Sequence, residues 1–145
     1  MNDQNHRRVE LTRTRKARLV ARNERGGELE LGEGDDGAFS PVELLLAGIA
    51  GCTAIDVDYI TSKRAEAEAF TVTVEADKVR DEQGNRLTDI VVRFAIAFPD
   101  SDGGDAAREV LPAAVQRSHD RLCTVSRTVE VGTPVTVEIE ETSRD

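Results

Sequence analysis

The sequence is poor in aromatic residues and carries no basic excess. Aromatics make up 3% of the 145 residues, with no tryptophan and one tyrosine, and the net charge is −9. So few aromatic side chains leave little on which nucleic acid bases could stack. An acidic chain also lacks the positive surface that a phosphate backbone requires. We therefore expect no nucleic acid partner.

Cysteines and long apolar runs are scarce as well. Two cysteines are too few for a disulfide-dense secreted scaffold. No uninterrupted apolar run reaches the roughly 18 residues of a membrane-spanning helix. Residues 1–16 contain no apolar stretch typical of a secretory signal. We therefore expect a cytosolic protein without a membrane partner, in which a cysteine pair is reduced or redox-active rather than structural.

The charge is distributed unevenly along the chain. Residues 1–25 hold eight basic and three acidic side chains, whereas the remaining 120 residues hold 11 basic and 25 acidic ones. One interpretation is a solvated basic sheet edge, because charged edges discourage edge-to-edge pairing. The other is that one of these arginines serves a site elsewhere in the protein.

Periodicity predicts three short strands followed by a long helix. Apolar and polar residues alternate between Val9 and Leu31, which is typical of strands with one buried face. An acidic loop, residues 32–37, comes next. Ser40 then fits a helix N-cap, Pro41 the first helical position, and Glu43 a capping box. The following residues to Ile55 are apolar on all sides, so we expect a buried helix that extends to about residue 65.

The second half predicts two strands, a second helix and a last strand. The strands are expected at Phe70–Val79 and Leu87–Phe98, and the helix at Asp105–Arg121. Pro112 inside that helix implies a break or kink. Residues Val135–Glu141 alternate as a final strand. The order β-β-β-α-β-β-α-β indicates a single α+β domain over residues 1–145, with antiparallel sheets packed on helices.

Residues able to carry chemistry are few. The chain has two histidines, His6 and His119, and none of the motifs of common metal proteases or serine hydrolases. His119 and Cys123 are spaced four residues apart, but no second pair completes a zinc site. We therefore expect neither a metal nor another cofactor, although stoichiometric metal in an elemental analysis would revive a third interpretation as a metal protein.

Two interpretations of Cys52 and Cys123 stay open at this point. Both can be small buried hydrophobic residues, as free cysteines often are. Alternatively they form a reactive thiol and its resolving partner. A free thiol has a pKa near 8.5, so it requires activation. Cys52 lies too far along its helix to feel the N-terminal dipole, and a cation brought near by the fold, from the arginine-rich first strands, is the obvious activator.

Two segments resemble the OsmC/Ohr family, within its OsmC-like branch. They are SPVELLLAGIAGCTAIDVD, around Cys52, and LCTVSRTVEVGTPV, around Cys123. The resemblance implies an α+β homodimer, intertwined around long central helices, that reduces organic hydroperoxides. It implies that Cys52 is peroxidatic and becomes a sulfenic acid, that Cys123 resolves it to a disulfide, and that a thiol or dithiol reductant restores both.

The resemblance also implies an arginine and a glutamate at the site. Arg15 occupies the matching first turn, with Arg13, Lys16 and Arg18 close by in the sequence. The glutamate of the family's peroxidases is replaced here by Val42. Glu43, nine residues before Cys52, would lie about 180° from it around a helix, which suits a capping role better.

The sequence thus predicts a cytoplasmic redox protein that detoxifies organic or lipid hydroperoxides in an oxidative stress response. The all-apolar residues around Cys52 are suited to line a pocket for such a substrate. The alternative is a non-enzymatic dimer of the same fold that binds a small hydrophobic ligand, with both cysteines as packing residues. The replacement of the glutamate at position 42 favours that alternative.

Overall fold

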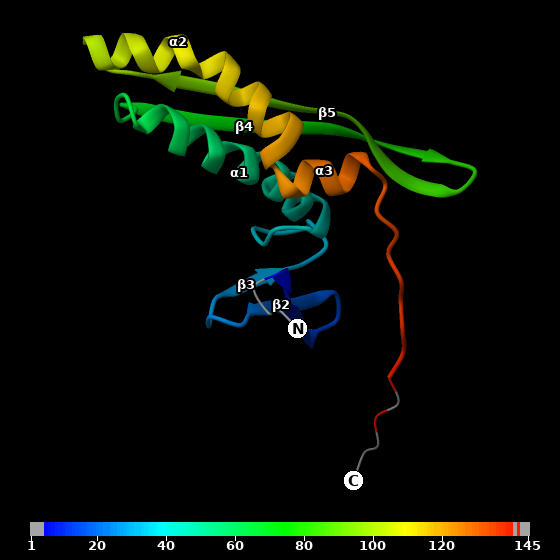
Figure 1. The fold of residues 1–145 in the computed structure, drawn as a ribbon. Helices are drawn as coiled ribbons and strands as arrows, with labels where there is room; N and C mark the ends of the chain where they lie inside the picture. The colour runs from blue at the N-terminus through cyan, green and yellow to red at the C-terminus, as the bar shows by residue number, and fades with distance from the viewer. Residues whose placement is uncertain (1–4, 141, 143–145) are drawn as a thin grey trace. The chain divides into compact units, whose positions relative to one another are not determined.

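The computed structural model describes residues 5–140 and residue 142, and its chain divides into two compact units. The first unit is Met1–Gly48 and the second is Ile49–Asp145. Figure 1 shows the elements of both. The α+β class expected from the sequence is confirmed, with one three-stranded and one two-stranded antiparallel sheet. The division falls within a helix, so that a single domain over residues 1–145 stays a prediction.

The first unit is built on the three predicted strands. Strands β1 (Val9–Arg15), β2 (Arg18–Asn23) and β3 (Glu28–Leu31) form an antiparallel sheet in the order β1-β2-β3. The turn from β1 to β2 places Ala17 at a positive φ of 58°. The expected buried face is only partly realised, because Val9 and Leu11 of β1 stay 62% and 49% exposed.

Helix α1 (Pro41–Ser62) begins as its sequence predicts. The Glu43 carboxylate accepts a hydrogen bond from the Ser40 N–H at 2.9 Å, and the Ser40 hydroxyl accepts one from the Glu43 N–H at 3.2 Å. This reciprocal capping box satisfies two N–H groups at the helix start. Its carboxylate is thereby committed to the cap, and the first of these hydrogen bonds lowers the pKa of Glu43.

Helix α1 is also long and apolar enough, by length and composition alone, to cross a membrane. An 18-residue window within it has a mean hydropathy of 1.5, and 28% of that window is buried. The core helix of a folded domain can have the same length and composition, so these features do not identify a membrane span. Because only 28% of the window is buried, much of the apolar surface of α1 is exposed.

The second unit contains a long hairpin, which is coloured green in Figure 1. Strands β4 (Ala69–Asp81) and β5 (Gly84–Ala97) pair along their whole length, with an irregularity between Glu75 and Asp77. Each strand is longer than expected, because the predicted turn tightens to residues 82–83. Side chains alternate between half-buried and exposed along both strands, as expected when one face of a sheet packs on helices.

Three helical segments follow the hairpin. Helix α2 (Asp102–Arg117) continues into a π-helical turn, η2 (Ser118–Leu122), and then into α3 (Thr124–Glu130), which the sequence analysis did not predict. Of the break or kink predicted at Pro112, the break does not occur, because α2 runs through Pro112 to Arg117. A proline removes a single helical hydrogen bond of its own, and the turns on either side continue the helix.

The predicted last strand, Val135–Glu141, is also wrong for the residues that the structure describes. Residues 135–140 form no strand, and residue 141 lies outside the described part. Figure 1 shows this segment as an extended trace beyond α3. Val135, Val137 and Ile139 are 87%, 87% and 94% exposed. The alternation has strand character, but a strand requires a hydrogen-bonded neighbour, and the described residues of this chain supply none.

Candidate functional site

The fold brings the two cysteines together in the second unit. Cys52 lies on α1, and Cys123 lies at the junction of η2 and α3. Each thiol affects the pKa of the other, so the two lie close together although they are far apart in the sequence, and both are free. Cys123 is completely buried, whereas Cys52 is partly exposed. A reagent from solvent therefore meets Cys52 first.

A partly buried hydrogen bond holds the segment that carries Cys123 against α1. The Ser118 hydroxyl, at the start of η2, donates to the Asp56 carboxylate at 2.7 Å. The Cys123 N–H donates to the Ser118 carbonyl at 2.8 Å. Asp56 lies one helical turn after Cys52, so this link fixes the position of η2 along the axis of α1. Cys123, at the end of η2, therefore lies close to Cys52.

The two thiols differ in their surroundings. Burial raises the pKa of Cys52, the Val125 N–H opposes it, and the neighbouring Cys123 raises it further. Burial also raises the pKa of Cys123, but hydrogen bonds, that of Ser126 foremost, outweigh it and bring this pKa below the ordinary range. Coupled thiols lose their protons in two steps that belong to the pair. The surroundings therefore favour the ionised form at Cys123 more than at Cys52.

A cavity of about 530 Å³ shares two residues with the surroundings of Cys123. Thr53 of α1 and Ser126 of α3 line it, and both also affect the pKa of Cys123. The rest of its wall comes from β5, α1, α2, η2 and α3. The apolar residues of that wall are Ile49, Leu87, Ile90, Val92, Phe94, Val115 and Val129. At its polar side the His119 imidazole lies 3.4 Å from the Glu130 carboxylate. The cavity can accept a small apolar molecule.

No three side chains of His, Cys, Asp or Glu gather closely enough to hold a metal ion within residues 5–140. His119, which the sequence analysis considered with Cys123, faces Glu130 instead. His6 is exposed near the start of the chain. The described residues therefore offer the thiol pair, rather than a ligand cluster, as the centre of the site.

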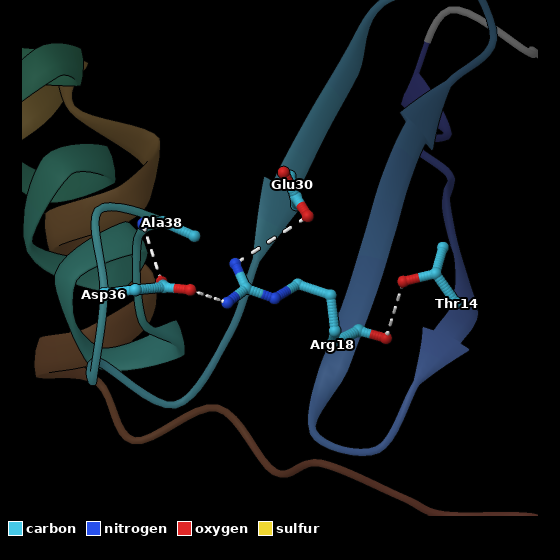
Figure 2. A network of polar contacts seen from close by, with 5 residues as sticks. All are labelled: Thr14, Arg18, Glu30, Asp36 and Ala38. Atoms are coloured by element: carbon cyan, nitrogen blue, oxygen red, sulfur yellow. Dashed lines mark hydrogen bonds and ion pairs between the residues drawn. The ribbon is translucent and has the colours of Figure 1, made fainter.

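Arg15, the arginine that the sequence resemblance selects, ends β1 in the first unit and is exposed. The buried arginine of this unit is Arg18, whose side chain is 6% exposed. Figure 2 shows its guanidinium between Asp36 and Glu30. Asp36 comes from the acidic loop before α1, and its carboxylate also accepts from the Ala38 N–H at 3.0 Å. The Arg18 Nε is buried without a hydrogen-bond partner among the described residues.

The Arg18–Asp36 ion pair was not predicted from the sequence. Seven other basic residues surround Arg18 within the first 25 positions, and nothing in the pattern distinguishes it from them. One signal was present: Arg18 is the first residue of β2 after the turn, on the face opposite Leu19. A charged side chain on an inward face requires a partner, and the loop rich in acidic residues was the nearest source.

We predict that Asp36→Asn lowers the thermal stability at neutral pH, because it leaves the buried Arg18 guanidinium with only the more distant Glu30 carboxylate at 3.8 Å. The Ala38 N–H, followed by Arg18, holds the pKa of Asp36 below its ordinary range. Such a group stabilises the fold above the ordinary carboxyl pKa of about 3.9 and loses this effect as the pH falls through the lower folded-state value.

Thermal unfolding followed by circular dichroism at neutral pH and below about pH 4 tests this expectation. The difference between wild type and Asp36→Asn should shrink in acid. Asp35→Asn removes the same charge from the same loop without an ion pair within 4 Å among the described residues, and should have the smaller effect. Equal loss from both variants would contradict a specific Arg18–Asp36 pair.

Comparisons with known proteins identify the family. A sequence model described as OsmC-like protein matches residues 33–138. An uncharacterized protein of Mycobacterium tuberculosis, Rv2923c, is 30% identical over 133 residues, which cover 90% of this chain and 93% of that protein. The family-model match over residues 33–138 includes both cysteine segments and confirms the resemblance that they carry.

Solved structures agree in fold. An OsmC-like protein of unknown function from Vibrio cholerae has a TM-score of 0.71 at 15% identity, covering 86% of this chain and 94% of that one. The organic hydroperoxide resistance protein OhrB of Bacillus subtilis has a TM-score of 0.53 at 17% identity, covering 85% and 90%. At these identities the likeness concerns the fold alone. Together with the sequence match over residues 33–138, it shows that the chain belongs to the OsmC-like protein family.

Proposed function

We propose that this protein reduces organic hydroperoxides with a redox-active pair, in which Cys52 is peroxidatic and Cys123 resolving. The observation that carries the proposal is the proximity of two free thiols of unequal exposure, each of which affects the pKa of the other. Membership of a family that includes organic hydroperoxide resistance proteins supports the substrate class. The partly exposed Cys52 is the thiol that a peroxide would reach, and the buried Cys123 is protected until Cys52 is oxidised.

The chemistry balances over three steps. The Cys52 sulfur attacks the outer peroxide oxygen, the O–O bond breaks, and the alkoxide takes up the thiol proton to leave as an alcohol. The Cys123 thiolate then attacks the sulfur of the Cys52 sulfenic acid. The S–S bond forms, the S–O bond breaks, and hydroxide leaves as water after taking up a proton. A dithiol reductant of the cytosol finally exchanges with the disulfide and becomes oxidised itself.

The raised pKa of Cys52 sets a condition on this mechanism. The raised pKa favours the protonated form of the partly exposed Cys52, so the first step requires a cation or a base. We propose that Arg15 contributes to this activation. If so, Arg15→Ala should slow hydroperoxide reduction while Arg15→Lys, which keeps the charge, slows it less. Equal rates for wild type and Arg15→Ala would remove Arg15 from the proposal.

The experiment is to measure the consumption of an alkyl hydroperoxide with and without a dithiol. We expect the wild type to turn over only with the dithiol. Cys123→Ser should reduce about one equivalent and then stop, with Cys52 driven to sulfinic acid, because no resolving thiol remains. Mass spectrometry of that variant without any oxidised adduct on Cys52 would contradict the division of roles.

We also propose that the working form is a homodimer in which a second copy covers apolar surface. The exposed apolar residues of α1 support this: Val42, Leu45, Ile55 and Tyr59 are 42–71% exposed. Such residues on a long apolar helix are typical of an interface. Sedimentation in detergent-free buffer should give a dimer at micromolar concentration. A monomer, or a requirement for detergent that points to a membrane, would contradict the proposal.

A second candidate is a non-enzymatic dimer that binds a small hydrophobic molecule. The cavity of about 530 Å³ supports it, and so does the raised pKa of Cys52. On this alternative, Cys52→Ser would leave binding of an apolar fluorescent probe unchanged, and no hydroperoxide would be consumed by the wild type.

A further inference from the structure

Cys123 occupies a position where cysteine is unusual. It is the N-cap of α3, and its sulfur accepts a hydrogen bond from the Ser126 N–H at 3.3 Å. Serine, threonine, aspartate and asparagine are the residues that commonly hold this position, because their oxygen atoms accept well. A neutral thiol is a weak acceptor, whereas a thiolate is a strong one. The cap therefore becomes stronger when Cys123 is ionised.

The hydroxyl of Ser126 adds a second contact to the same sulfur. The Cys123 thiol donates to Ser126 Oγ at 3.2 Å, and both residues are buried, with 0% and 8% exposure. When Cys123 loses its proton, the hydroxyl can rotate and donate to the thiolate. Thr53, 6% exposed on α1, brings a further hydroxyl to Cys123. The sulfur is thus surrounded by donors that favour its ionised form.

We propose that Ser126, assisted by Thr53, is a positioning residue that holds Cys123 as a thiolate aimed at Cys52 for disulfide formation. The inference rests on the proposed function and adds residues that act through Cys123 without touching the peroxide. In the resolving step the sulfur of Cys123 supplies the electron pair of the new S–S bond. A thiolate supplies it far better than a thiol, so hydroxyl donors at this sulfur determine how fast the sulfenic acid is trapped.

Cys52 is the ionisable group whose titration is coupled to that of Cys123. Three further ionisable groups on the surrounding elements have other partners. On α1, Asp56 accepts the hydrogen bond of Ser118 at 2.7 Å. On η2 and α3, the His119 imidazole lies 3.4 Å from the Glu130 carboxylate. A titration of Cys123 is therefore cleanest when Cys52 is replaced by serine, which keeps a hydroxyl at that position and removes the coupled thiol.

The test is a pH titration of the ultraviolet absorbance of the thiolate in the full-length Cys52→Ser protein. In that background Ser126→Ala should move the titration of Cys123 to higher pH. Ser126→Thr should leave it in place, because Thr keeps the hydroxyl and its methyl group has room in the adjoining cavity. Thr128→Ala is the matched control: its hydroxyl, on the same helix, bonds the Thr124 carbonyl at 2.7 Å and not the sulfur.

With both cysteines present, Ser126→Ala should also slow closure of the disulfide after one equivalent of alkyl hydroperoxide by about tenfold, the effect of one lost charge-assisted hydrogen bond. An unchanged titration, or a Ser126→Thr variant that shifts as far as Ser126→Ala, would overturn the inference. Should Ser126→Ala fail to fold, the pair Thr53→Val and Thr53→Ser gives the same comparison on α1, with a shift expected only for Thr53→Val.

The titration requires no peroxide, so its outcome is separate from that of the proposed function. If the protein consumes no hydroperoxide but Cys123 titrates as expected, the effect of Ser126 on Cys123 stands and its role in catalysis is excluded. A protein that consumes hydroperoxide but shows no shift in Ser126→Ala would keep the peroxidase and lose the role of Ser126.

Discussion

Cys52→Ser is expected to reduce the dithiol-dependent consumption of alkyl hydroperoxide by about a thousandfold or more, to the rate without protein. The serine hydroxyl has nearly the shape of the thiol but does not attack a peroxide oxygen. No other thiol can replace it, because the second cysteine of this chain, Cys123, is completely buried. The measurement is the initial rate of hydroperoxide loss at saturating dithiol.

The control for this variant is Thr128→Ala, which changes an exposed hydroxyl on α3 and should keep the full rate. The fold of Cys52→Ser should stay intact, as judged by its thermal unfolding, because the substitution is nearly isosteric at a partly exposed position. A Cys52→Ser protein that consumes hydroperoxide at the wild-type rate would remove Cys52 from the chemistry.

Gly104→Ala is expected to have the largest effect on stability. Gly104 lies in the first turn of α2, where its N–H donates to the Ser101 hydroxyl of the N-cap at 3.0 Å. A β-carbon at this position would lie 1.7 Å from the Pro99 carbonyl oxygen and 2.8 Å from its carbon. Backbone atoms cannot move aside as a flexible side chain can, so the start of α2 would have to shift. We expect a loss of about 3 kcal/mol.

Urea unfolding of Gly104→Ala against wild type measures this loss. Gly37→Ala is the matched control, because a β-carbon at Gly37 would meet nothing within 4 Å. It should change the free energy of unfolding by less than about 0.5 kcal/mol. If both variants unfold at the wild-type midpoint, the close approach of Pro99 to α2 is not a feature of the folded protein.

The start of α1 and the strands of both sheets were predictable because their signals are local. Ser40, Pro41 and Glu43 specify the start of α1 within four positions, and the capping box forms as expected. The alternation in β4 and β5 likewise predicts a hairpin, although its strands extend closer to the turn than expected. Such patterns depend on hydrogen bonds within one turn or between adjacent strands.

What the sequence did not predict depends on contacts between distant residues. Val135, Val137 and Ile139 alternate like a strand, but alternation cannot reveal whether a neighbouring strand exists. Helix α3 is short, and it begins at Cys123, which is not among the common N-cap residues. Both cases show that a local sequence pattern indicates only a preference for a strand or helix. Whether the element forms depends on contacts with residues far away in the sequence.

Some residues of the candidate site were predictable from the sequence and others were not. Cys52 and Cys123 were predicted from their flanking segments, and the structure brings them together. The hydroxyls of Ser126 and Thr53 were missed, since serine and threonine are common residues that carry no motif at these spacings. Arg18 was missed because it is one of eight basic residues in the first 25, and only its burial beside Asp36 distinguishes it.

The most direct test of a working thiol pair is the mass of the reduced protein after one equivalent of an alkyl hydroperoxide. The account predicts a species lighter by two hydrogen atoms, whose peptide map joins Cys52 to Cys123 by a disulfide that a dithiol reverses. Two free thiols after that treatment, with the hydroperoxide intact, would contradict it.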